Sequence, residues 1–348
     1  MRKKVTIQDI ADALGISRNT VSKAINNSDG LAEATREKIL QKAVEMGYKQ
    51  FSYVSTLSNI KTAAANPFPE VTGYVGEIAL LTSTFLTQSH FASTMLDKFQ
   101  QEISQLGYTM NTHRVTDLNL QELSLPATFV PERVSAIVCI EMFDLTYDRM
   151  VCELGIPVLF VDGPAKRCGE SLSADQLYMD NTTEITRFVY DMLRAGHRRI
   201  GFIGDYDHCQ SFFERYTAFR CAMLMAGVPV DENDCLASNR MEDIYEKIRQ
   251  WESLPDVFIC ANDFVAWDTM NALSSIGKSV PEDVRILGFD DSPESRMSRP
   301  PMSTIHIHTQ IMAFSAVHLL ITRIREPSLD YRILHTETEL IYRQTTGY

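Results

Sequence analysis

The chain has 348 residues, of which 45% are hydrophobic and 22% are charged, and its formal net charge at pH 7 is −12. This composition is typical of a globular protein long enough for more than one domain. It contains no apolar run near the roughly 20 residues of a membrane-spanning helix, and its seven cysteines lack a C-x-x-C pair, which predicts neither a disulfide framework nor a zinc site. The amphipathic, charged N-terminus predicts no signal segment. We therefore expect a cytoplasmic protein without a metal or other cofactor.

Charge is distributed unevenly along the chain. Residues 1–61 carry ten Lys and Arg against six Asp and Glu, a net charge of +4, so the remaining residues carry −16. A basic head on an acidic body is typical of a protein whose head binds a polyanion and whose body does not. Charge alone leaves open the alternative of a solvated basic face.

The first 48 residues predict three short helices. Thr6 and Asp9 form a capping-box pattern, apolar residues follow at helical spacing, and Gly15 ends this first helix. Ser17 is placed to cap a second helix, and a third helix is expected at about 34–46. Two helices that are joined by a tight turn and closed by a third form a helix-turn-helix.

The second of these helices is the candidate DNA-reading element. In a helix-turn-helix it enters the major groove with its N-terminal residues on the base edges. Arg18 could donate to guanine and Asn19 could pair with adenine, while Lys23 and other basic residues bind phosphates. The alternative is a three-helix packing unit whose polar residues face water.

The stretches "VTIQDIADALGISRNTVSKAINN" and "EATREKILQKAVEMGY" resemble the DNA-binding head of the lactose-repressor/galactose-repressor family of bacterial transcription regulators. That family reads V-T-x-x-D-[IV]-A-x-x-[AL]-G-[IV]-S-x-x-T-V-S-[RK], then T-R and a terminal Tyr, which this chain matches. The resemblance implies that Arg18, Asn19 and Lys23 occupy the base-reading positions. The predicted DNA-binding set is Thr6, Ser17, Arg18, Asn19, Thr20, Ser22, Lys23, Asn26 and Leu57.

Residues 49–70 are expected to be a hinge and linker. In the family a hinge helix reading P-N-x-x-A-R-x-L follows the terminal Tyr, and its Leu wedges into the minor groove. Here the segment reads "QFSYVSTL", and Leu57 matches the wedge. Packing of Leu57 against the body is the alternative. Four other positions depart from the pattern: Gln50, Phe51, Val54 and Ser55.

From residue 71 onward, apolar runs of strand length alternate with helix-length segments. The runs are "GEIALLT", "SAIVCI", "PVLFVDG", "RRIGFIGD", "DVFICAND" and "VRILGFDD". This alternation predicts parallel sheets covered by helices on both faces. Because about 275 residues are many for one sheet, we expect two α/β lobes. Lobe 1 is predicted at about 71–162 and 294–326, and lobe 2 at about 163–293 and 327–348.

Polar residues follow most of these runs, among them Ser83, Asp162, Asn262 and Asp290. In open α/β sheets, ligands bind outside the carboxyl ends of the strands. Such side chains can hydrogen-bond a hydroxyl-rich molecule, and an aromatic residue such as Phe91 can face its ring. For any single position, capping of the following helix is the alternative.

The body also resembles that family, whose effector-binding body shares its fold with periplasmic sugar-binding proteins. The similar stretches are "GHRRIGFIG", "VFICANDFVAWDTMNALSSIGKSVPEDVRILGFDDSPES" and "RPPMSTIHI". The resemblance implies that Arg215, Asn262 and Asp290 hold the effector. The chain departs from the family where Ala218 replaces the usual Gly and "QSHF" replaces N-P-[FY]-F. The predicted effector set is Ser83, Phe91, Asp162, Arg215, Asn262 and Asp290.

Two other classes of protein are weighed against a regulator. An enzyme is disfavoured because G-x-G-x-x-G, the P-loop and G-x-S-x-G are missing, and because no His or Lys is placed by motif beside Asp290 and Asp291. His306 and His308 have strand spacing, but zinc would need further ligands. A transport-type binding protein would lack the helix-turn-helix head.

The sequence therefore predicts an all-α helix-turn-helix head on an α/β two-lobed body like that of the periplasmic binding proteins. We expect a homodimer, by resemblance a repressor, on a pseudo-palindromic double-stranded operator. The effector is expected to be a sugar or sugar derivative that binds between the lobes. A cytoplasmic small-molecule-binding protein or an enzyme on this fold is the alternative.

Overall fold

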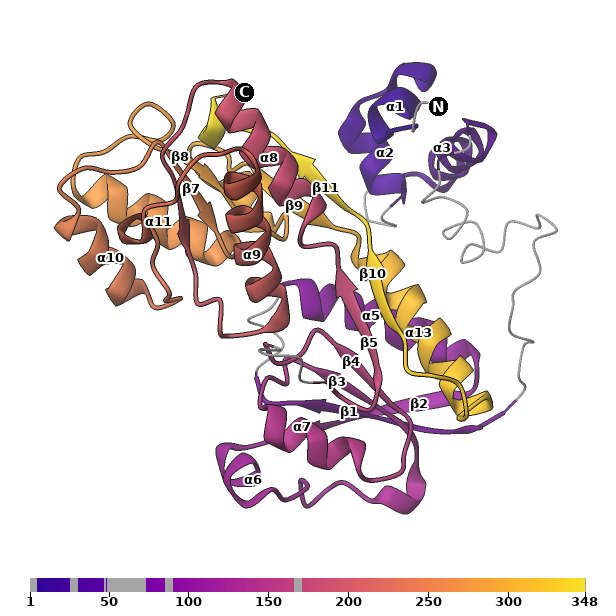
Figure 1. The fold of residues 1–348 in the computed structure, drawn as a ribbon. Helices are drawn as coiled ribbons and strands as arrows, with labels where there is room; N and C mark the ends of the chain where they lie inside the picture. Colours follow the sequence, from indigo (N-terminus) through magenta and orange to yellow (C-terminus); the bar gives the residue numbers. More distant parts are fainter. Residues whose placement is uncertain are drawn as a thin grey trace. The chain divides into compact units, whose positions relative to one another are not determined.

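The structure, a computed structural model, describes residues 5–25, 31–46, 48, 73–84, 90–165 and 171–347. The chain forms two compact units, Met1–Gly73 and Tyr74–Tyr348 (Figure 1). The predicted hinge and linker at 49–70, and with them Leu57, lie outside the described residues, as does Asn26. No helix within the described ranges is both long and apolar enough to cross a membrane.

The first unit contains the three predicted helices, which are α1 (Ile7–Leu14), α2 (Arg18–Ile25) and α3 (Glu33–Met46). The capping box is confirmed, since the Thr6 hydroxyl accepts from the Asp9 N–H and the Asp9 carboxylate accepts from the Thr6 N–H. Gly15 ends α1 with a φ of 66°, in the left-handed region that favours glycine. The Ser17 hydroxyl accepts from the Thr20 N–H at 3.1 Å and so caps α2.

The apolar faces of the three helices meet in one small core. Fully or nearly buried side chains include Ile10, Val21, Ile39 and Leu40, and each contributes about 1.5–3 kcal/mol by leaving water. Arg36 of α3 reaches across this core. Its guanidinium donates to the Lys23 and Ala24 carbonyls at 3.5 Å, which satisfies carbonyls at the end of α2 and fixes that helix against α3.

The first lobe of the second unit is built on a six-stranded sheet. All of its strand pairs are parallel, and the order is β10-β5-β4-β3-β1-β2. Helices α5 and α13 pack against each other, and Figure 1 shows α6 and α7 on the opposite side of the sheet. The elements are β1 (Gly76–Thr82), α5 (His90–Gln105), β2 (Tyr108–Arg114), α6 (Asp117–Glu122), η2 (Pro131–Arg133), β3 (Val134–Ile140), α7 (Leu145–Cys152), β4 (Val158–Val161), β5 (Asp175–Met179), α13 (Thr309–Arg325) and β10 (Ile333–Thr336).

The second lobe has a parallel three-stranded sheet in the order β6-β7-β8 and an antiparallel pair of β9 and β11. Bridges from Leu287 to Ser303 and from Asp290 to His306 join β9 to the end of β8. The elements are α8 (Thr183–Arg194), β6 (Ile200–Ile203), α9 (Gln210–Met225), η3 (Glu232–Asp234), α10 (Met241–Gln250), β7 (Val257–Cys260), α11 (Asp263–Ser275), β8 (Arg285–Leu287), α12 (Pro293–Met297), β9 (Thr304–Ile307), β11 (Thr338–Ile341) and η4 (Gln344–Thr346).

The sheet order corrects the predicted lobe boundaries. Strand β5 pairs with β4, so the first lobe continues past residue 162 to the end of β5. The sequence concealed this strand because its first two residues, Asp175 and Gln176, are polar yet buried. The Asp175 carboxylate is satisfied by Arg323 and Arg332. Strand β10 belongs to the first sheet and β9 to the second lobe, which reverses their predicted assignments.

Among the described elements, the chain passes between the two lobes after β5, after β9 and after β10. The first and third of these crossings are hydrogen-bonded to each other. The Asp180 N–H donates to the Thr336 carbonyl at 2.7 Å, and the Thr338 hydroxyl donates to the Asp180 carbonyl at 2.9 Å. Any change in the angle between the lobes must therefore be accommodated at these paired segments.

Candidate functional site

The polar face of α2 is the candidate nucleic-acid surface. Arg18, Asn19 and Lys23 are exposed, whereas Val21 and Ala24 are buried on the other side of the helix. Asn19 and Lys23 are one helical turn apart, so they share one strip of surface. This arrangement places the predicted base-reading residues where a major groove could meet them, and their contact with DNA stays a prediction.

Two residues of the predicted DNA-binding set have structural roles in the head. The Thr6 hydroxyl is engaged with Asp9, and the Ser17 hydroxyl lies 2.7 Å from that of Thr20. N-caps of this kind stabilise a helix by about 1 kcal/mol. Thr20 and Ser22 are half-buried beside the exposed strip. Thr6 and Ser17 therefore fix the starts of α1 and α2 whether or not they also touch DNA.

A cavity of about 200 Å³ lies in the second unit, where strand ends of the two lobes face each other. A larger hollow, of about 720 Å³, runs along α10, but it is lined by residues of that one helix and is a surface groove. The cavity is therefore the candidate ligand site, in agreement with the position expected for open α/β sheets. Its lining is Phe91, Glu141, Phe143, Asp162 and Met179 from the first lobe, and His208, Cys209, Ser211, Phe212, Arg215, Asn262, Phe264 and Asp290 from the second.

Five of the six predicted effector residues line this cavity; Ser83 does not. Its hydroxyl donates to the Glu141 carbonyl at 2.6 Å, which joins the ends of β1 and β3. Ser83 thus holds Glu141, a lining residue with a φ of 55°, in a backbone conformation that side chains other than glycine rarely adopt. Strain of this kind costs about 1–3 kcal/mol and is typical of functional sites.

Arg215 is the one guanidinium among the described residues of the lining, and it is 2% exposed. Its Nε donates to Asn181 Oδ1 at 2.9 Å, its Nη1 donates to the Ala261 carbonyl at 2.6 Å, and its Cζ lies 3.5 Å from the centroid of the Phe289 ring. Burial lowers the pKa of Arg215, and the nearby Asp290 carboxylate opposes that shift. The side chain is thus fixed before any ligand arrives, which reduces the entropy lost on binding.

Asp290 enters the cavity from a strained turn after β8. Its φ is 119° and that of Asp291 is 54°. Burial raises the pKa of Asp290 well above its ordinary value; Arg215 opposes this shift, while Asp263, Glu141 and Asp162 add to it. A ligand beside Asp290 would meet the carboxyl groups of Glu141 and Asp162 and the guanidinium of Arg215.

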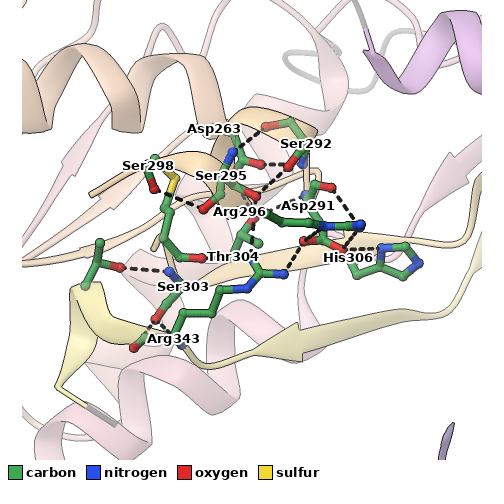
Figure 2. A network of polar contacts seen from close by, with 12 residues as sticks. Asp263, Asp291, Ser292, Ser295, Arg296, Ser298, Ser303, Thr304, His306 and Arg343 are labelled. Carbon is green, nitrogen blue, oxygen red and sulfur yellow. Dashed lines mark hydrogen bonds and ion pairs between the residues drawn. The ribbon is translucent and has the colours of Figure 1, made fainter. Parts of the chain in front are cut away.

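The Asp290 turn is held by the polar network of Figure 2. The Asp291 carboxylate accepts from Arg296, Arg343 and His306, and Figure 2 shows these side chains converging on it. Although burial alone would raise it, these contacts hold the pKa of Asp291 well below its ordinary value. A buried carboxylate with this many charged donors stays ionised and rigid.

Asp263 extends the same network toward α11 (Figure 2). Its carboxylate accepts from the Thr304 hydroxyl at 2.6 Å and from the Ser292 N–H at 2.8 Å. Burial raises the pKa of Asp263 to about 6. Its neighbour Asn262 caps α11, with Oδ1 accepting from the Val265 N–H at 2.9 Å. The helix-cap alternative is thus correct for Asn262, and the cap leaves the amide NH₂ as a donor toward the cavity.

Asp162 has a role that links the two lobes. Its Oδ1 accepts from the Gly163 N–H at 2.8 Å and from the Ser211 N–H at 3.2 Å. Cys209, the N-cap residue of α9, provides no side-chain cap of its own. A carboxylate of the first lobe therefore caps a helix of the second lobe.

Several lining residues were not in the predicted set. The rings of Phe143 and His208 come from opposite lobes and meet edge to face with centroids 4.8 Å apart. Burial lowers the pKa of His208, so the imidazole is neutral near pH 7. Glu141 and Phe143 could have been found because they directly follow β3. His208 and Phe212 carry no local signal, since only the folding of α9 against the strand ends brings them here.

The described residues contain no group of three or more His, Cys, Asp and Glu side chains arranged to hold a metal ion. The described lining of the cavity instead offers aromatic faces, one guanidinium, one amide and three carboxyl groups. This chemistry suits a small ring that carries several hydrogen-bonding groups.

The two units of the chain match two different family descriptions. Residues 6–50 match the family described as "Bacterial regulatory proteins, lacI family", and residues 189–346 match "Periplasmic binding protein-like domain". The HTH-type transcriptional repressor PurR of Vibrio parahaemolyticus is 26% identical over 351 residues, which cover 98% of each chain. The HTH-type transcriptional regulator CelR of Thermobifida fusca is 25% identical over 356 residues, which cover 99% of each.

Solved structures are similar over the full length. A complex of the transcriptional regulator CelR with cellobiose has a TM-score of 0.68 at 22% identity and covers 98% of this chain and 100% of that one. The lac repressor dimer bound to operator and the anti-inducer ONPF has a TM-score of 0.63 at 19% identity and covers 99% of each chain. These likenesses establish the fold.

Proposed function

We propose that the chain belongs to the lacI family of bacterial regulatory proteins, which its residues 6–50 match, and that it is a sequence-specific transcriptional repressor controlled by a small sugar or sugar derivative. The observation that carries the proposal is the combination of two sites in one chain. An exposed polar strip on α2 follows the family's pattern, and a cavity between two lobes collects five of six predicted effector residues. The relatives that span nearly the whole chain are themselves regulators.

The DNA-binding part of the proposal follows from the head. α2 enters the major groove, with Arg18 and Asn19 on base edges and Lys23 on phosphate. Two copies of the chain form a homodimer on a pseudo-palindromic operator, because a two-fold dimer matches a two-fold site. The acidic body repels DNA, which confines contact to the basic head. A cytoplasmic location and the lack of catalytic activity belong to the same proposal.

The ligand class is supported by the size and charge of the cavity. About 200 Å³ is small beside the 300–1,000 Å³ typical of drug-sized ligands. Arg215 and Asn262 supply donors, three carboxyl groups supply acceptors, and Phe91 and Phe212 offer ring faces. Among the described lining residues, one guanidinium against three carboxyl groups disfavours a phosphorylated ligand, so a neutral sugar or polyol is the better fit. Related CelR is known in complex with cellobiose.

Control of DNA binding requires two arrangements of the lobes. A ligand shifts the balance between them only by binding one arrangement more tightly than the other. The crossings that join the lobes are the segments that must adjust. The ligand's contacts with both lobes at once provide the required difference in affinity.

The test is a thermal-shift screen of the full-length protein against hexoses, pentoses, cellobiose, polyols, sugar phosphates and nucleobases. A compound at 100 times its dissociation constant stabilises the bound form by about 2.7 kcal/mol. Asp290→Ala, which removes the carboxyl group, should abolish the shift, whereas Glu326→Gln, a change at an exposed carboxyl after α13, should keep it. A blank across the panel, or a shift that survives in Asp290→Ala, contradicts the proposed ligand site.

DNA binding is tested separately by selecting sequences from a random duplex library with the full-length protein. A two-fold symmetric consensus is expected. Recovery of no consensus would favour a binding protein or an enzyme on the same fold over a regulator.

A further inference from the structure

Asn181 is a buried polar residue on the first crossing between the lobes. It is 1% exposed and lies two residues after the end of β5. Its Oδ1 accepts from Arg215 Nε at 2.9 Å, and its Nδ2 donates to Glu214 Oε2 at 2.9 Å and to the Met179 carbonyl at 3.1 Å. One amide thus holds two consecutive side chains of α9 and the end of β5.

The neighbouring Glu214 also bridges the lobes. Its Oε1 accepts from Gln210 at 3.0 Å and lies 3.7 Å from Nε2 of His335, which belongs to β10 of the first sheet. Burial opposes its ionisation, but the nearby His335 ring and the hydrogen bonds from Gln210 and Asn181 hold the pKa of Glu214 below its ordinary value. The carboxylate is therefore charged, and it needs the Asn181 amide as one of its donors.

These contacts form a continuous series of neighbouring residues and hydrogen bonds from the cavity to the crossings. Arg215 lines the cavity, Asn181 holds Arg215, and the adjacent Asp180 is hydrogen-bonded to Thr336 and Thr338 of the third crossing. A displacement of the Arg215 guanidinium has to move the amide of Asn181 or break its hydrogen bonds.

We propose that Asn181 is a positioning residue that presents Arg215 to the cavity and, through its hydrogen bond to Glu214, couples the start of α9 to the crossings between the lobes. The role of Arg215 toward a ligand rests on the proposed function. The coupling of α9 to the crossings does not, so it is tested without any ligand.

The experiment reverses donor and acceptor in the hydrogen bond between Asn181 and Glu214. Asn181→Asp keeps an acceptor for Arg215 but sets a carboxylate against Glu214. Adding Glu214→Gln to that variant restores a hydrogen bond in the opposite direction, since the new amide donates to the new carboxylate. Glu214→Gln alone keeps an acceptor for Asn181 and serves as the matched control.

Amide hydrogen exchange of the full-length protein, read by mass spectrometry of peptides, reports the local opening of each segment. For Asn181→Asp we expect exchange about tenfold faster in residues 175–183, 210–216 and 333–341, with residues 241–275 unchanged. Glu214→Gln should stay within about threefold of the wild type. The double variant still lacks the donor to the Met179 carbonyl, so it should exchange more slowly than Asn181→Asp by about threefold or more without fully reaching the wild type.

Two results would overturn the proposal. One is exchange in the three segments of Asn181→Asp that equals the wild type. The other is a double variant that exchanges as fast as Asn181→Asp, because a merely space-filling role would not be rescued by reversing donor and acceptor. A blank ligand screen leaves this comparison unaffected, so failure of the proposed function and failure of the coupling are distinguishable.

Discussion

The carboxylate of Asp162, at the end of β4, accepts a 3.2 Å hydrogen bond from the backbone N–H of Ser211, at the start of α9. The adjacent Gln210 N–H donates to the Gly163 carbonyl at 2.9 Å. Asp162 also lines the cavity, so a ligand donor that bonds this carboxylate competes with the helix end for it. The same side chain therefore joins the lobes and faces the ligand.

Asp162→Ala should loosen the contact between the lobes. Loss of the N-cap costs about 1 kcal/mol, while Asp162→Asn, which keeps an oxygen acceptor but loses the charge beside the helix N-terminus, should cost about 0.3–1 kcal/mol. Urea unfolding of the full-length protein measures both values. If the alanine variant is no less stable than the asparagine variant, the cap does not act as described.

Arg18→Ala and Lys23→Ala should affect DNA binding in different ways. Arg18→Ala should relax base preference at one position of each half-site at a cost of about 1–3 kcal/mol. Lys23→Ala should weaken all duplexes alike and reduce the slope of log affinity against log salt by about 1. Fluorescence anisotropy with the selected duplex and single-base variants distinguishes them. An unchanged base preference in Arg18→Ala would remove Arg18 from the reading set.

The head could be predicted from the sequence because its signals are local. Thr6, Asp9, Gly15 and Ser17 mark helix ends by hydrogen bonds within a few residues, and the structure has the same caps. Arg36 shows the limit of such reasoning. Its match to the family pattern did not explain why an arginine stands at this position. The structure gives the reason, because the guanidinium contacts α2 carbonyls that are twelve and thirteen positions away in the chain.

The body was predicted less completely because its site is assembled by tertiary structure. Strand β5 was hidden by Asp175, whose burial is possible only because Arg323 and Arg332 meet it from distant segments. Ser83 was placed in the cavity by its position after a strand, but its hydroxyl turns to Glu141. Asn181 gave no signal at all, since its side-chain partners Glu214 and Arg215 are more than thirty residues away.

Asp291→Asn should destabilise the protein and release the Asp290 turn. Removing the Asp291 charge leaves Arg296 and Arg343 without their shared carboxylate. Breaking a buried ion cluster costs about 3–5 kcal/mol of the free energy of unfolding. Because Arg296 is half-exposed, we expect a loss near the lower end of this range. Urea unfolding at pH 7 measures the loss. Glu294→Gln, on the same helix α12 but exposed, should change stability by less than about 0.5 kcal/mol.

The pH dependence has a definite sign. Because the pKa of Asp291 is depressed in the folded state, its contribution to stability is present above the unfolded pKa of about 4 and is lost as the pH falls toward the folded value. The difference in stability between wild type and Asp291→Asn should therefore narrow below pH 4. A constant difference from pH 7 to pH 3 would contradict this assignment.

Asp148 of α7 should make the protein less stable as the pH rises. Its side chain is fully buried, and neither carboxylate oxygen has a hydrogen-bond partner among the described residues. Burial, with a smaller effect of Asp144, raises the pKa of Asp148 to about 8. Between about pH 4 and pH 8 the unfolded chain loses this proton while the folded chain keeps it, so the free energy of unfolding falls across that window.

Asp148→Asn removes this titration without changing the shape of the side chain. We expect the variant to match the wild type at pH 4 and to exceed it at pH 7.5 by about 2–4 kcal/mol, since each unit of pKa shift corresponds to about 1.4 kcal/mol. Thermal unfolding at both pH values provides the measurement. Asp144→Asn, which keeps the cap on the Tyr147 N–H, is the control and should shift stability only slightly. Equal gains for Asp148→Asn at pH 4 and pH 7.5 would show that packing, rather than the buried proton, limits stability at this position.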